Sequence, residues 1–163
     1  MTKKPPLIDF ALLAPVPEEH LLTGRDVAAK EGFVAFGSRK WELFREVDRL
    51  REGQEVPVLI YPSHEDVAAK LTFAVAWTGW YSGHVNSKMG AHPDGMKYRP
   101  PSTATRPGDN SGHWAVFWHV RDLSRRRGKP VGISSLESYK RPGFWRMDAP
   151  PIGPEVVARP TWI

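Results

Sequence analysis

A long segment without regular periodicity, residues 83–112, carries many of the side chains that could bind a ligand. It contains five glycines and four prolines, which leave little room for a helix or a strand. A loop of this length inside a small domain is usually functional. Its cations can meet phosphate groups, and they are Lys88, Lys97, Arg99 and Arg106. We therefore expect this segment to form part of a binding surface.

Aromatic and amide side chains accompany these cations. Trp80, Tyr81 and Tyr98 offer rings on which a base can stack, worth ~1–3 kcal/mol per base. Asn86 and Ser87 can read base edges through hydrogen bonds. Cations interleaved with aromatics are typical of proteins that bind single strands or a flipped base. The alternative is a surface loop whose charges only keep the protein soluble, with Tyr98 anchoring it.

The charge of the chain is unevenly distributed. Residues 1–83 carry ten Lys and Arg against twelve Asp and Glu, whereas residues 84–163 carry thirteen against six, for a net charge of +5. This asymmetry favours one basic face that attracts a polyanion, although solubility alone would also explain it. A basic turn could contact a phosphate backbone, and it contains Arg125, Arg126, Arg127 and Lys129.

A second pair of cations, Arg39 and Lys40, lies at the start of an expected helix. Cations there oppose the helix macrodipole. An outside anion, such as a phosphate held by the free N–H groups, would compensate for this. Screening by Glu42 and Glu46 explains the pair equally well.

Proton transfer has three candidate residues, Glu42, His84 and His92. An imidazole with a pKa near 6.5 suits that work. Four of the six histidines lie between residues 84 and 119, but their spacing matches no helical metal motif and there is no cysteine. We predict neither a metal site nor a cofactor. The known phosphate-loop, hydrolase and metalloprotease motifs are missing, so the sequence nominates no nucleophile.

The elements that must position these residues are mostly short strands. One helix is expected over residues 39–51, where Leu43, Phe44, Val47 and Leu50 form one apolar stripe after the potential cap Ser38. Pro57 favours either an edge position or the start of the strand that contains it. The expected strands cover residues 33–36, 56–61, 71–81 and 113–120, with shorter apolar pieces at 131–136 and 156–158.

This order predicts an α+β, mainly β fold: a small barrel with one or two packed helices. A doubly wound fold would need more helices between the strands. We expect residues 1–30 to form an arm packed on the core and residues 31–163 to form a single domain.

The order of elements resembles the PUA-like superfamily, which includes the PUA, ASCH, EVE and YTH domains. The ASCH motif G-x-K-x-x-E-x-R is similar to residues 37–45: Gly37 and Glu42 match, Arg39 replaces the lysine, and Arg45 comes one residue late. Residues 53–60 and 131–136 are similar to further strands of the family, so the resemblance covers about residues 33–160.

The resemblance implies a PUA-like barrel with a pocket between its strands and the first helix. Such a pocket accepts a base, often a modified one, or the backbone of a structured RNA. Some ASCH members are amidohydrolases that act on an acylated cytosine through Lys, Thr and Glu. The threonine is missing here, because Lys40 and Trp41 occupy the neighbouring positions.

The sequence thus predicts binding of nucleic acid, either RNA or a modified or flipped base in DNA. The alternatives are a hydrolase of a nucleobase derivative or phosphodiester on the same scaffold, and a small-molecule binding domain. No apolar run approaches the ~20 residues that span a bilayer, and no secretory signal is recognisable. Together with the lack of cysteine, this predicts a cytoplasmic protein without a membrane partner.

Overall fold

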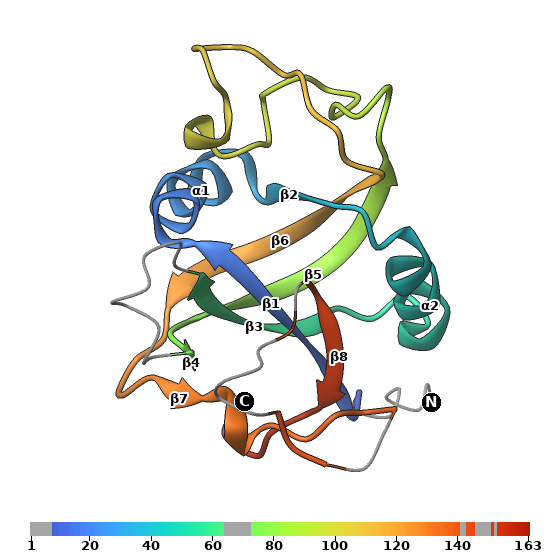
Figure 1. Ribbon diagram of the computed structural model, residues 1–163, viewed down its shortest axis with the longest axis vertical. Helices are drawn as coiled ribbons and strands as arrows, with labels where there is room; N and C mark the ends of the chain where they lie inside the picture. Colours follow the sequence, from blue (N-terminus) through green and yellow to red (C-terminus); the bar gives the residue numbers. More distant parts are fainter. Residues whose placement is uncertain (1–7, 64–72, 141–142, 146–150, 152) are drawn as a thin grey trace, which may run out of the picture.

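The computed structural model describes residues 8–63, 73–140, 143–145, 151 and 153–163. Its centre is a six-stranded sheet, curled into a half-barrel, with strand order β2-β6-β5-β3-β1-β8 (Figure 1). The strands of this sheet are β1 (Phe10–Pro17), β2 (Val34–Ser38), β3 (Val56–Ser63), β5 (Trp77–Asn86), β6 (Val116–Arg125) and β8 (Glu155–Ala158). A smaller sheet pairs β4 (Ala74–Val75) with β7 (Val131–Gly132).

Two α-helices, α1 (Glu18–Glu31) and α2 (Trp41–Arg51), accompany the sheet in the described part of the chain. The prediction of a mainly β, small-barrel fold with one or two helices is therefore confirmed. The stripe predicted for α2 faces the core: Phe44 and Val47 are fully buried, and Leu43 and Leu50 pack against the same cluster. Ser38 is the last residue of β2, and its Oγ accepts a hydrogen bond from the Lys40 N–H at 3.1 Å.

The prediction that an N-terminal arm packs on the core is wrong for the described residues 8–30. Strand β1 lies inside the sheet, parallel to β3 on one side and antiparallel to β8 on the other. Its first residues are buried on both faces of the sheet, with Phe10 and Leu12 in one cluster and Ala11 and Leu13 in the other. Its apolar run shows no alternation and is rich in Ala, Leu and Pro rather than in β-branched residues, which disguised it in the sequence. Residues 1–7 lie outside the described part.

Two further strand predictions need correction. For Pro57 the edge alternative is wrong, because β3 lies between β5 and β1. The strand-start alternative agrees with the structure, because Pro57 is the second residue of β3 and the parallel ladder with β1 begins at Val58. The strand expected over residues 71–81 is divided at Ala76 between β4 and β5, and residues 71 and 72 lie outside the described part. Strand β5 runs on to Asn86, so the long loop occupies residues 87–115 and includes the short 3-10 turn η2 (Pro101–Thr103).

The loop 87–115 extends beyond the end of the sheet (Figure 1). Its side chains and backbone also contact β2 and β6. Phe33 stacks on both Tyr98 and His119, each at a ring-centroid distance of 4.3 Å. The Ala35 N–H donates to the Tyr98 carbonyl at 2.6 Å, so the loop covers part of the β2 edge. These contacts hold the loop in a defined place despite its lack of regular structure.

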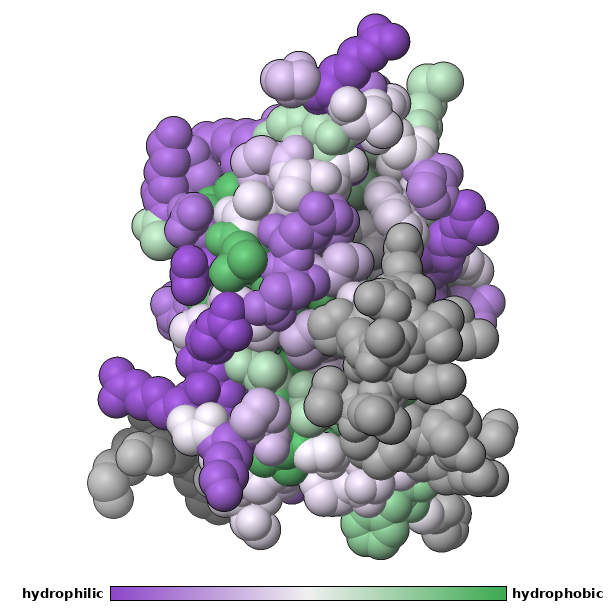
Figure 2. All heavy atoms as spheres, turned by 60° about the vertical axis from the view of Figure 1, so that its left-hand side comes forward, coloured by the Kyte–Doolittle hydropathy of each residue, from purple (hydrophilic) through white to green (hydrophobic). Residues whose placement is uncertain are grey.

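Figure 2 shows the face that comes forward when the left side of Figure 1 is turned toward the viewer. Hydrophilic side chains predominate among its coloured atoms, and apolar ones form small separate patches. Within the described residues, no helix is long and apolar enough to cross a membrane.

Candidate functional site

A cavity of about 730 Å³ lies where the end of β1 and the first turn of α1 meet β2 and the loop 87–115. Its size falls within the range of ligand pockets, ~300–1,000 Å³. The residues that line it come from segments far apart in the chain, and they are Pro15, Val16, Pro17, Glu19, His20, Ala35, Phe36, Gly37, Arg99, Ser102, Thr103, Ala104, Thr105, Ser111, Gly112, His113, Trp114, Trp118 and Pro154.

Three aromatic side chains form walls of the cavity: Phe36 from β2, Trp118 from β6 and Trp114 from the loop. Gly37 explains the position of Trp114, because a Cβ on Gly37 would lie 2.4 Å from the indole ring. The indole thus packs directly on the β2 backbone. Such rings provide a flat apolar surface for a planar ligand. The buried Nε1 of Trp118 has no hydrogen-bond partner among the described residues.

Arg99 supplies a buried positive charge to the cavity, with only 3% of its surface exposed. Its Nη1 donates to the Asn110 carbonyl at 2.7 Å and to Asn110 Oδ1 at 3.0 Å, and its Nη2 lies 3.5 Å from Thr103 Oγ1. The guanidinium also lies over the Phe117 ring, 5.3 Å from the centroid.

The acceptors around Arg99 are neutral oxygens, and no carboxylate of the described residues forms an ion pair with it. Burial lowers the pKa of Arg99, and the charge of Asp109 acts in the opposite direction. Buried charges in proteins are usually paired with an opposite charge. A cavity that presents an unpaired guanidinium is therefore suited to an anionic ligand.

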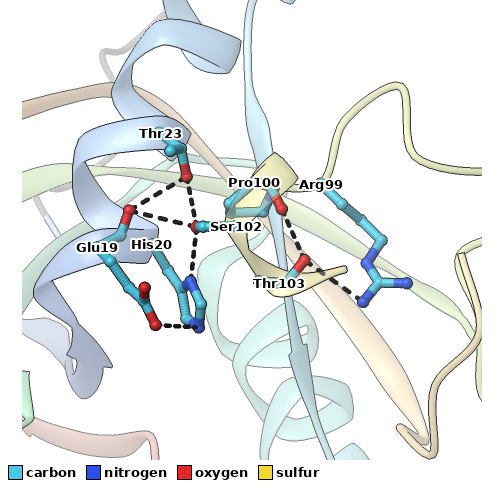
Figure 3. Close-up of polar contacts among 7 residues, drawn as sticks. All are labelled: Glu19, His20, Thr23, Arg99, Pro100, Ser102 and Thr103. Atoms are coloured by element: carbon cyan, nitrogen blue, oxygen red, sulfur yellow. Dashed lines mark hydrogen bonds and ion pairs between the residues drawn. The ribbon is translucent and has the colours of Figure 1, made fainter. Parts of the chain in front are cut away.

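A hydroxyl–imidazole pair lies on the α1 side of the cavity (Figure 3). Ser102 Oγ from η2 is 2.7 Å from His20 Nδ1 and 2.7 Å from Thr23 Oγ1, and it can donate to the Glu19 carbonyl at 3.3 Å. Burial lowers the pKa of His20, and the charge of Glu19 opposes this shift. Its Nε2 lies 3.8 Å from Glu19 Oε1. The group fastens η2 to α1 and thereby fixes one side of the cavity.

Of the residues predicted to bind nucleic acid, Arg99 lines this cavity. The other loop cations are exposed: Lys97 lies over the Tyr98 ring at 5.2 Å and 4.0 Å from Glu31, and Lys88 and Arg106 project from the loop. Asn86 is exposed at the end of β5, and the backbone N–H of half-buried Ser87 donates to Ala115 at 2.9 Å.

Several of the predicted residues make structural contacts instead. Lys40 Nζ forms an ion pair with Glu155 at 2.6 Å and donates to the Pro154 carbonyl at 3.0 Å. Tyr81 is buried, and its hydroxyl donates to Asp48 at 2.8 Å. Tyr98 anchors the loop, as the sequence alternative proposed. Trp80 lies opposite Pro57 in the sheet, and neither Trp80 nor Tyr98 lines the cavity.

The arginines of the basic turn differ in the contacts they make. Arg125 belongs to β6, forms an ion pair with Glu18 at 2.9 Å and lies over Trp77. Arg126 lies over the Trp162 ring at 4.7 Å and donates to the carbonyls of residues 127 and 129. Arg127 is exposed.

The three proton-transfer candidates lie outside the cavity lining. Glu42 is exposed in the first turn of α2. His84 Nδ1 contacts Asp48 Oδ2 at 2.7 Å. His92 is only 2% exposed, and its Nε2 lies 3.3 Å from His119 Nε2. Among the described residues, no group of three or more His, Cys, Asp or Glu side chains could hold a metal ion.

Sequence reasoning missed His20, Ser102 and Trp114 as parts of one site. His20 and Ser102 are 82 residues apart, and no periodic pattern connects a helix turn with a residue inside an irregular loop. Gly37 did give a usable signal, since a glycine at the end of a strand often marks a close approach of another group.

Comparisons with models of protein families, with curated proteins and with solved structures found no match to this chain.

Proposed function

We propose that this protein binds nucleic acid by accepting one unpaired base, of RNA or of a modified or flipped DNA nucleotide, in the cavity beside β2. One observation carries the proposal: the guanidinium of Arg99 is buried in the cavity wall without a carboxylate partner. An anionic nucleotide would compensate that charge.

The aromatic walls support the same ligand class. Trp114 is half-buried and can offer a ring face, and stacking of a base on an aromatic ring is worth ~1–3 kcal/mol. Phe36 and Trp118 are buried in the core and complete the aromatic wall of the cavity. A base must leave a duplex to enter such a cavity, so single strands are the preferred ligand. The excess of cations in residues 84–163 would raise the rate of encounter. The resemblance to PUA-like domains and the expected cytoplasmic location agree with this role.

Fluorescence polarisation with labelled single strands of RNA and DNA, and with a duplex, tests the proposal at two salt concentrations. We expect single strands to bind more tightly than the duplex and the affinity to fall steeply with salt. Arg99→Met should weaken binding ~10- to 100-fold, since a hydrogen bond to a charged group contributes ~1.5–3 kcal/mol.

Arg127→Met is the matched control, because Arg127 is an exposed cation outside the cavity lining. Trp114→Ala provides a second cavity variant that does not remove a buried charge. Melting curves establish that each variant is folded. Equal binding of duplex and single strand, or equal effects of Arg99→Met and Arg127→Met, would contradict the proposal.

A second candidate, a hydrolase on the same scaffold, is favoured by the 2.7 Å contact between Ser102 Oγ and His20 Nδ1 at the cavity wall. In that reaction Ser102 Oγ would attack the carbonyl carbon of an ester, and His20 would take the hydroxyl proton and pass it to the leaving group. Water would then release the acyl group. A fluorophosphonate probe should label Ser102 in the native chain and fail to label His20→Ala. An unlabelled native protein would exclude this candidate.

A further inference from the structure

Trp41, the first residue of α2, is unusually exposed for its type, with 47% of its surface accessible. It lies between two shallow surface hollows, one formed with Arg39 and Lys40 and the other with Arg45 and Arg49. The apolar stripe of α2 packs on the core without it, so folding does not require an indole at this position. An exposed ring among cations is the arrangement that single-strand binding surfaces use.

The cations beside Trp41 differ in how they are paired. Arg49 is held by Glu46 at 2.6 Å, whereas Arg39 and Arg45 are exposed and form no ion pair within the part of the chain that the structure describes. Both are therefore available to a phosphate. Glu42, on the same turn, is an exposed carboxylate in both hollows and would oppose an approaching polyanion.

This surface lies close to the cavity. Gly37 lines the cavity and lies four residues before Trp41, which limits their separation to ~14 Å even if the chain is fully extended. Lys40 strengthens the connection, because its Nζ binds the carbonyl of Pro154, which also lines the cavity. A strand with one base in the cavity can therefore reach Trp41 with its neighbouring nucleotides.

We propose that Arg39, Trp41 and Arg45 form a second subsite for the nucleotides that flank the inserted base. Trp41 stacks on a flanking base, and the two arginines contact the phosphates. This subsite rests on the proposed function, since its ligand is the strand that continues out of the cavity.

The test compares a nucleoside monophosphate with a short single-stranded oligonucleotide of the same base. Trp41→Ala should weaken oligonucleotide binding ~5- to 100-fold, the range expected for loss of one stacked base, and leave monophosphate binding unchanged. The double variant Arg39→Ala/Arg45→Ala should reduce the slope of log affinity against log salt by ~1.4, since each single-strand phosphate contact contributes ~0.7.

Two variants on the same helix act as controls of opposite kinds. Glu42→Gln should tighten oligonucleotide binding, because it removes the opposing carboxylate without changing the shape of the side chain. Arg49→Ala should have little effect, because Arg49 is already paired with Glu46. Because Trp41 is exposed, Trp41→Ala should fold like the native protein, and a melting curve checks this.

Oligonucleotide binding that is lost in Arg99→Met but unchanged in Trp41→Ala would overturn the second subsite and leave the cavity proposal standing. Equal weakening of monophosphate and oligonucleotide by Trp41→Ala would also overturn it. A native protein that binds neither ligand would refute the proposed function itself.

Discussion

Acidification from pH 7 to pH 5 should destabilise the protein through two histidines that hold the loop 87–115, the buried His92 and the half-buried His119. His119 lies between Phe33 and His92, and burial lowers its pKa from 6.5 to about 4, with the neighbouring charges of His92 and His84 acting in the same direction and Asp94 opposing them. The pKa of His92 is also lowered, mainly by burial. The neutral imidazoles therefore belong to the folded state.

The sign of the effect follows from proton uptake. A depressed folded-state pKa means that the contribution to stability is complete above pH 6.5 and disappears as the pH falls toward 4. At pH 5 the unfolded imidazole is protonated and the folded one is not, which corresponds to ~2 kcal/mol from one group. Because His119 is not completely buried, solvent screening reduces this to about 1–2 kcal/mol.

Thermal melts at pH 7 and pH 5 measure the effect. A loss of 1–2 kcal/mol corresponds to a decrease in Tm of ~2–8 °C for a chain of this size. The matched variant is His119→Phe, which keeps a ring against Phe33 and removes the titrating group. Its Tm should depend less on pH over this interval. The reasoning is refuted if native protein and His119→Phe lose the same Tm between pH 7 and pH 5.

Two further predictions concern contacts around the cavity. Gly37→Ala should lower the free energy of unfolding by ~1–3 kcal/mol and weaken ligand binding, because the new Cβ would lie 2.4 Å from the Trp114 ring. Chemical denaturation measures the stability and fluorescence polarisation the affinity. An unchanged affinity would contradict the role of Trp114 as a wall of the cavity. Lys40→Ala should cost about 1 kcal/mol by removing the half-exposed pair with Glu155, and a double-mutant cycle with Glu155→Gln should show coupling between the two side chains if that pair is the cause.

Local patterns predicted the elements that show a clear helical period or a run of β-branched residues. Helix α2 was recognisable because Leu43, Phe44, Val47 and Leu50 recur at the helical period and the opposite side is charged. Strand β1 was not recognisable, because it shows no alternation and is rich in Ala, Leu and Pro. Strand β3 is also buried on both faces, but its β-branched residues identified it. The place of β1 between β3 and β8 depends on partners 40 or more residues away, as the pairs Leu12–Val58 and Phe10–Ala158 show.

Some features of the candidate site were also visible in the sequence, and others depend on the fold. The sequence by itself determined the excess of cations, the long loop and the presence in it of Arg99. Only the tertiary structure decided which of these cations is buried. Arg99 lines a cavity because aromatic contacts fold the loop back onto β2 and β6, while Lys88 and Arg106, in the same loop, remain in solvent.

Tertiary structure also decided which side chains meet at the cavity. His20 and Ser102 meet because η2 packs on the first turn of α1, and Trp114 packs on Gly37 because that residue has no side chain. Composition fixes how many charges and rings a chain carries, since these are properties of residues. Burial and pairing are properties of contacts between distant segments, and they decide which charge is left to meet a ligand.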